Sequence, residues 1–275
     1  MVGSLRAVGD WESAMQGEID EITPARYTEH LANGVADVPD APPALRRYDA
    51  AFRKVMDEIG TTAASRNRPA VWYVYNMGIV VKTAESLFAV DLHHRLAPLL
   101  APKLDFALVT HNHGDHCTGA FLLEMDRLGK PVVSNFLGGS VSRKYYSHHP
   151  RTLEFKDVRV AVTVSDHNQY LREFVTPYEI SAGDFTIFHS GDTCSAEQVS
   201  CTRPPDLWFV HPYVGLDVAE GARRLRPKLT QIVHLHEFGH ARDQFRWTFA
   251  DGWRACGKVR DAGFAAAVPN WGERI

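Results

Sequence analysis

The sequence predicts an α/β protein in which β-sheets pack against each other and helices cover the outside. Two observations support this fold class. From residue 69 onward, short apolar stretches bounded by turn-forming residues alternate with segments of helical period. With 275 residues and a hydrophobic content of 45%, the chain can also bury a full core.

The first 67 residues differ from the rest because they are rich in charged residues and contain four prolines. Residues 44–59 place apolar side chains three and four positions apart, which predicts an amphipathic helix that ends at Gly60. These side chains are Leu45, Tyr48, Phe52, Val55, Met56 and Ile59. We therefore predict a helical N-terminal extension over residues 1–67 and a second unit over residues 68–275. The extension either caps a binding cleft or forms an interface in a homo-oligomer.

The second unit begins with strands at residues 71–75, 79–83 and 86–91, whose turn signals indicate a β-meander. Two helices are expected, one from residue 115 towards residue 128 and one over residues 219–225. Further strands are expected at residues 104–110, 131–134, 158–164, 184–189, 206–210 and 231–236.

Residues 111–116 read His-Asn-His-Gly-Asp-His and directly follow the apolar stretch at 104–110. Histidine accounts for 14 of 275 residues, so three histidines and one aspartate at these offsets arise by chance with a probability of roughly 0.002 over the chain. Three imidazoles and a carboxylate are more ligands than one metal ion needs from one loop. The motif therefore predicts a metal site with two ions.

Four further residues that could bind a metal also follow predicted strands. They are Asp91, His167, Asp192 and His236. Strands that lie side by side bring their ends to one rim, so we expect these side chains to converge on the motif at 111–116. Imidazole nitrogen and carboxylate oxygen suit zinc, and manganese or iron would also accept this set.

Bulk properties exclude several classes of function. The formal net charge of −3 gives no overall basic surface for nucleic acid. No apolar run approaches the roughly 20 residues of a membrane span, and residues 1–6 lack the apolar stretch of a signal peptide. The four cysteines form no CxxC pair. We therefore expect a cytoplasmic protein with reduced thiols and a small-molecule substrate.

From residue 69 to about residue 240, the chain resembles the metallo-β-lactamase-fold hydrolases. The resemblance lies in the motif at 111–116, the strand-end Asp91, His167, the Gly-Asp-Thr at 191–193, and His236. Residues 186–193, 206–215 and 231–237 look most like the branch that contains ascorbate-6-phosphate lactonase. The resemblance implies an αβ/βα four-layer sandwich with metals at one edge.

The resemblance also implies a ligand set. His111, His113 and His167 would hold the first ion, and Asp192 would bridge both ions. The second ion would be held by Asp115, His116 and His236. His234 competes with His236, because it lies two residues away on the same face of the predicted strand, but the family places its ligand at the strand end. Asp91 would orient ligands from beneath the site.

The resemblance gives Asp115, Asp192 and His236 the catalytic roles. His211, at a strand end on the same rim, is a candidate for substrate contact, as are Asn168 and Arg172, which closely follow His167. Glu237 and His240 follow His236 and either support the metal ligands or lie in a solvated loop, of which we expect the solvated loop. The candidate aromatic walls of the pocket are Trp72, Tyr75, Tyr170, Tyr213 and Trp247.

The resulting hypothesis is a dinuclear, zinc-dependent hydrolase in which a metal-bridging hydroxide cleaves a small ester, lactone or amide. Two alternatives remain on the same fold: a phosphodiesterase, and an iron-dependent redox enzyme. A non-catalytic binding module predicts a damaged motif, whereas the motif here is intact.

Overall fold

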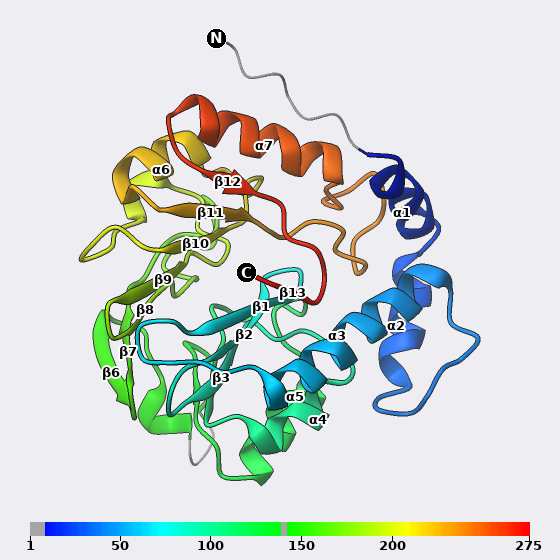
Figure 1. The fold of residues 1–275 in the computed structure, drawn as a ribbon, viewed down its shortest axis with the longest axis horizontal. Helices are drawn as coiled ribbons and strands as arrows, with labels where there is room; N and C mark the ends of the chain where they lie inside the picture. The colour runs from blue at the N-terminus through cyan, green and yellow to red at the C-terminus, as the bar shows by residue number, and fades with distance from the viewer. Residues whose placement is uncertain (1–8, 139–141) are drawn as a thin grey trace.

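Two β-sheets lie face to face in the computed structural model, which describes residues 9–138 and 142–275 (Figure 1). The first sheet has the strand order β13-β1-β2-β3-β4-β5, and the second has the order β12-β11-β10-β9-β8-β7-β6. The first sheet comprises β1 (Ala70–Tyr75), β2 (Gly78–Lys82), β3 (Leu87–Val90), β4 (Phe106–Leu108), β5 (Val132–Val133) and β13 (Glu273–Arg274). The second comprises β6 (Arg151–Phe155), β7 (Val158–Val162), β8 (Tyr178–Ala182), β9 (Phe185–His189), β10 (Leu207–Val210), β11 (Leu229–Ile232) and β12 (Ala266–Ala267).

Helices cover the outer face of each sheet, so the predicted αβ/βα sandwich is confirmed (Figure 1). The side of the first sheet carries α3 (Pro43–Thr61), α4 (Ala97–Leu100) and α5 (Gly119–Arg127), and the side of the second carries α6 (Val218–Leu225) and α7 (Phe249–Asp261). The remaining helices are α1 (Asp10–Asp20), α2 (Pro24–Ala32) and the short η1 (Ala101–Lys103), η2 (Ser142–Tyr145) and η3 (Ala196–Gln198).

Alternate side chains of the strands belong to two separate apolar cores. In β1, Val71 and Tyr73 face the core between the sheets, whereas Trp72 and Val74 face the core beneath the helices. Successive side chains of a strand point to opposite faces, so one strand contributes to both cores. The expected meander is confirmed, because β1, β2 and β3 are consecutive antiparallel neighbours.

The N-terminal helices pack onto the sandwich through the segment that follows β3. The predicted helix at 44–59 is confirmed as α3. The guanidinium of Arg95 is buried, pairs with Asp49 of α3, and donates to the carbonyl oxygens of Gly34 and Ala36 at 2.6 and 2.7 Å. The preceding ring of His94 stacks on Tyr48 of the same helix with centroids 3.8 Å apart.

Two predicted element boundaries lie four residues from the observed ones. The helix expected from residue 115 begins at Gly119, because Thr118 caps it by accepting a hydrogen bond from the backbone N–H of Phe121. The strand expected over 231–236 ends at Ile232. The prediction about residues 1–6 concerns a stretch outside the described residues.

The carboxyl ends of parallel strands meet at one edge of the sandwich. Strands β3 and β4 run parallel in the first sheet, and β9, β10 and β11 run parallel in the second. The loops that follow these strands carry the conspicuous histidines and aspartates of the sequence. The topology thus brings side chains far apart in sequence to one rim.

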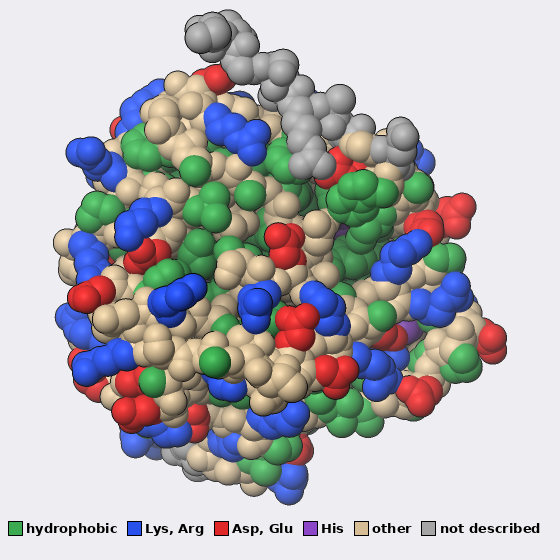
Figure 2. Space-filling view, in the orientation of Figure 1, with side chains coloured by type: hydrophobic (Ala, Val, Ile, Leu, Met, Phe, Trp, Pro, Cys, Tyr) green, Lys and Arg blue, Asp and Glu red, His purple; other side chains and the backbone are tan. Residues whose placement is uncertain are grey.

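Surface charge is mixed on the face drawn in Figure 2, where Lys and Arg side chains lie among Asp and Glu side chains. Among the helices of residues 9–138 and 142–275, none combines the length and apolar character that crossing a bilayer requires.

Candidate metal centre

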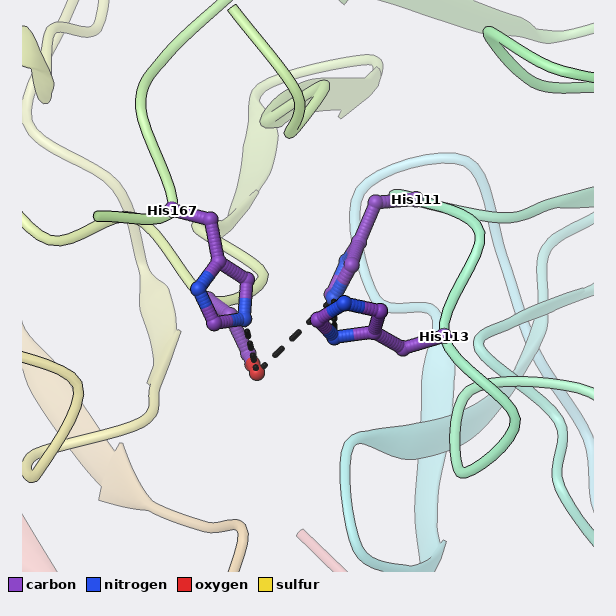
Figure 3. A group of neighbouring side chains, drawn as sticks. His111, His113 and His167 are labelled. Carbon is purple, nitrogen blue, oxygen red and sulfur yellow. Dashed lines mark hydrogen bonds and ion pairs between the residues drawn. The ribbon is translucent and has the colours of Figure 1, made fainter. Parts of the chain in front are cut away.

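Four side chains form the first group of candidate ligands: His111, His113, His167 and Asp192. The rings of His111 and His113 come from one loop and that of His167 from another, and they turn toward one another (Figure 3). His111 Nε2 lies 3.1 Å from His113 Nδ1 and 3.8 Å from Asp192 Oδ2. His167 Nε2 lies 3.5 Å from the same carboxylate oxygen. One ligand atom from each residue falls within 4.8 Å of the others.

A second group, Asp115, His116 and His234, adjoins the first. Asp115 Oδ2 lies 3.0 Å from His234 Nε2 and 3.8 Å from His116 Nε2. Asp192 Oδ2 lies 3.5 Å from His116 Nε2 and 3.6 Å from His234 Nε2. The carboxylate of Asp192 is therefore shared by the two groups.

Asp91 sits fully buried beneath the cluster and fixes the orientation of its neighbours. Its carboxylate accepts hydrogen bonds from the backbone N–H and the hydroxyl of Thr110, each at 2.7 Å, and contacts His116 Nδ1 at 2.8 Å. Because Nδ1 of His116 is bound to Asp91, Nε2 is the nitrogen that faces the cluster. The backbone of Asp91 is left-handed with φ of 44°, a strained conformation for a non-glycine residue.

Gly191 places Asp192 against the motif loop. Its φ is +52°, and a Cβ added here would lie 2.9 Å from Thr110 Cβ and from Val175 Cγ1. Glycine supplies both the left-handed conformation and the close approach. The strand β9 can therefore turn sharply and present the Asp192 carboxylate to both groups.

His236, the predicted ligand, does not join the cluster; His234 does. The prediction assumed an extended strand in which both side chains share one face. The strand ends at Ile232, and His234 and His236 adopt left-handed backbone with φ of 60° and 62°. The ring of His236 instead lies 3.1 Å from Gln16 Oε1 and packs on Phe249, and burial lowers its pKa to about 3.

The donor set fits divalent metal ions. Asp192 Oδ1 and His116 Nε2 are buried, yet neither has a hydrogen-bond partner within the described part of the chain. Burial lowers the pKa of His111 well below its ordinary value, which keeps its nitrogen lone pair free for a metal. Burial alone would raise the pKa of Asp192. The nearby imidazoles outweigh burial and hold the pKa of that carboxyl well below its usual range; they are those of His234, His116 and His211.

A cleft of about 550 Å³ opens onto the cluster. It is lined by His113, Gly114, Asp115, His167, Asn168, Asp192, His211, Tyr213, Val214, His234, His240, Phe245 and Trp247. Of the five candidate aromatic walls, Tyr213 and Trp247 lie in the cleft and stack with centroids 4.3 Å apart. Trp72 and Tyr75 belong to the core beneath the helices, and Tyr170 is 84% exposed.

The other predicted contact residues divide between the cleft and the surface. His211 lines the cleft and stacks on His234 with centroids 3.9 Å apart. Asn168 lines it too, with Nδ2 3.2 Å from His167 Nδ1. Arg172 is exposed and is not among the lining residues. Glu237, expected in a solvated loop, is 1% exposed, so that expectation is wrong.

No family model matches the chain, but solved structures share its fold. A metallo hydrolase from Ignicoccus hospitalis is 19% identical, with a TM-score of 0.58 over 75% of this chain and 97% of that chain. A metallo-β-lactamase-fold protein from Bacillus subtilis is 14% identical, with a TM-score of 0.53 over 75% and 99%. The chain therefore has the metallo-β-lactamase fold; the resemblance to the lactonase branch stays a prediction.

A diiron β-hydroxylase from Streptomyces venezuelae is also similar in structure, at 14% identity and a TM-score of 0.59. The match covers 78% of this chain and 54% of the hydroxylase, so this chain corresponds to about half of that protein. The same fold thus occurs in proteins described as hydrolases and in one described as a hydroxylase.

Proposed function

We propose that the protein is a dinuclear metal-dependent hydrolase of a small ester, lactone or amide. The observation that carries this proposal is that Asp192, which lines the cleft, lies within ion-pair distance of histidines from both ligand groups. His111, His113, His167 and Asp192 would hold one divalent ion, and Asp115, His116, His234 and Asp192 the other. We expect zinc, with manganese or iron as the other candidates.

The chemistry of such a pair is Lewis-acid catalysis, because two close ions lower the pKa of water and polarise a carbonyl or phosphoryl oxygen. The protein's own residues position and desolvate the reactants. Asp91 and Thr110 hold the imidazoles of the cluster in fixed orientations. The stacked rings of Tyr213 and Trp247 form an apolar wall on which the non-reacting part of a substrate can pack.

The cleft favours an uncharged substrate over a phosphodiester. Among the described residues that line it, none is lysine or arginine, the side chains that usually bind phosphate. A phosphodiester would therefore find no permanently charged cationic side chain in the described lining of the cleft. This composition supports the ester, lactone or amide as the substrate class.

A substrate panel combined with metal analysis tests the proposal. We expect the purified protein to hold two divalent ions per chain and to hydrolyse 4-nitrophenyl acetate, a γ-lactone or an anilide faster than bis(4-nitrophenyl) phosphate. The His113→Ala variant should lose bound metal and more activity than the roughly 100-fold that loss of an outer-shell partner costs.

The His149→Ala variant is the matched control, because His149 is exposed and lies outside the cleft. A metal-free wild-type protein, or full activity in His113→Ala, would overturn the proposal. The second candidate, an iron-dependent oxygenase, is favoured by the diiron hydroxylase among the similar structures. Tightly bound iron and oxygen uptake without hydrolysis would select it.

A further inference from the structure

Glu237 and His240 form an acid–imidazole pair at the edge of the cleft. Glu237 Oε2 lies 2.8 Å from His240 Nδ1. The glutamate side chain is 1% exposed, whereas that of the histidine is 39% exposed and lines the cleft. The carboxylate is within ion-pair distance of Nδ1, so Nε2 is the nitrogen left for a substrate.

The loop that carries this pair is fixed from several sides. Glu237 Oε1 accepts a hydrogen bond of 2.7 Å from the backbone N–H of Gly239, which leaves Oε2 for the histidine. A Cβ at Gly239 would lie 2.9 Å from Oε1, so a larger residue here would displace the carboxylate. Arg246 donates to the carbonyl oxygens of Glu237 and Phe238 at 3.1 and 2.9 Å and also to that of His240.

A purely structural ion pair would not need an open face on the cleft. Its histidine could be enclosed completely, as His236 is nearby. His240 instead stands with the exposed Phe245 on the wall of the pocket that contains the ligand cluster. A carboxylate beside one nitrogen of an imidazole that lines a reaction cleft is an arrangement found in general acid–base catalysis.

We propose that Glu237 holds His240 in position to protonate the leaving group of the substrate. Attack by water on the acyl carbon breaks the bond from that carbon to the leaving oxygen or nitrogen. The electron pair of that bond stays on the leaving atom, which takes a proton from His240 Nε2. One proton of the attacking water restores His240, and the other is released with the carboxylate product. This role rests on the proposed hydrolase function.

The charges around His240 support its protonated form. Glu237 raises the pKa of His240 against burial, Asp115 raises it further, and His234 opposes the increase. Among the described residues, Arg246 is the only arginine whose guanidinium bonds to this loop. It donates to the backbone carbonyl of His240. Activity that depends on this proton should decline as the pH rises above the His240 pKa.

The test compares two substrates with one acyl group and different leaving groups, an ethyl ester and a 4-nitrophenyl ester. Ethoxide needs a proton to leave, whereas 4-nitrophenolate does not. For His240→Gln we expect about a 100-fold loss of kcat/KM with the ethyl ester and less than about a 10-fold loss with the nitrophenyl ester. Metal content should stay at the wild-type level, and the decline of activity at alkaline pH should disappear.

Glu237→Gln is the second variant, because it keeps a group that can bond to His240 but removes the charge. We expect it to show the same dependence on the leaving group, with a smaller loss. His149→Gln, on the exposed surface, should leave both substrates unaffected. Equal losses with both esters in His240→Gln would overturn the proton-transfer role. If the wild-type protein hydrolyses neither ester nor any other panel substrate, the proposed function itself fails.

Discussion

The backbone conformation at two histidines determines which of them faces the candidate ions. His234 and His236 both have positive φ, a conformation that costs about 1–3 kcal/mol for a non-glycine residue. The backbone N–H of His234 bonds to the carbonyl of Asn76, and that of His236 bonds to the carbonyl of Trp247. Partners on different segments therefore hold the two residues in their separate orientations.

Paired variants test this assignment at the residue scale. Asparagine tolerates left-handed backbone, so His234→Asn and His236→Asn change the side chain with little added strain. We expect His234→Asn to lose bound metal and His236→Asn to retain it. His236→Asn should instead lower the melting temperature by roughly 2–4 °C for each kcal/mol of lost packing on Phe249. The reverse pattern of metal loss would restore His236 as the ligand.

Local patterns carry most of what the sequence predicts about the site. The motif at 111–116 is confined to one loop, so its convergence needs no long-range information. The sequence does not single out His234, because its orientation depends on contacts with Asn76 and on the early end of β11, neither of which has a local signal. Strands β12 and β13 have two residues each and pair with β11 and β1, so tertiary contacts define them.

At the scale of elements, a buried charge cluster joins the N-terminal helices to the sandwich. Asp49 of α3 contacts His30 of α2 and the guanidinium of Arg95. Apolar residues of these helices belong to the same core as Trp72 and Val80. We therefore propose that residues 9–67, the described part of the predicted extension, fold onto the sandwich and do not form a separate unit.

Replacing Asp49 tests this attachment. Asp49→Asn leaves the buried Arg95 without its carboxylate, so we expect the free energy of unfolding to fall by about 3 kcal/mol at neutral pH. Burial raises the pKa of Asp49, but His30 and Arg95 outweigh it and lower the pKa from its ordinary 3.8. The stabilisation is therefore complete above 3.8 and is lost as the pH falls through the depressed value.

Urea unfolding of both proteins across this pH range measures the difference. The difference in the free energy of unfolding between wild type and Asp49→Asn should be constant near neutral pH and should vanish in acid. Asp57→Asn, on the exposed face of the same helix, is the control and should unfold like the wild type. A difference in unfolding free energy that increases in acid would contradict the predicted attachment.

For the whole molecule, metal binding should be coupled to stability. The ligands come from loops after β4, β7, β9 and β11 of both sheets, so the complete site exists only in the folded chain. An ion at 100 times its dissociation constant stabilises such a site by about 2.7 kcal/mol. We expect a chelator to lower the melting temperature by roughly 5–10 °C, and zinc to restore it.

Thermal unfolding in the presence and absence of chelator measures this shift. His113→Ala should start from a lower melting temperature and respond less to the chelator. An unchanged wild-type melting temperature after verified removal of the metal would show that the ligand loops hold their positions without ions.

Arg246 also constrains the order in which the chain acquires its structure. Besides the loop carbonyls, its guanidinium binds the carbonyl oxygens of Ile19 and Ile22, at 3.2 and 2.6 Å and across 227 and 224 positions of sequence. Such distant closures are slow, because the entropy of a long loop is lost before the contact forms. During synthesis, the helices near Ile19 emerge from the ribosome long before Arg246. The cleft wall that carries His240 should therefore be among the last parts to become ordered, and nascent chains should acquire activity only after both ends have met.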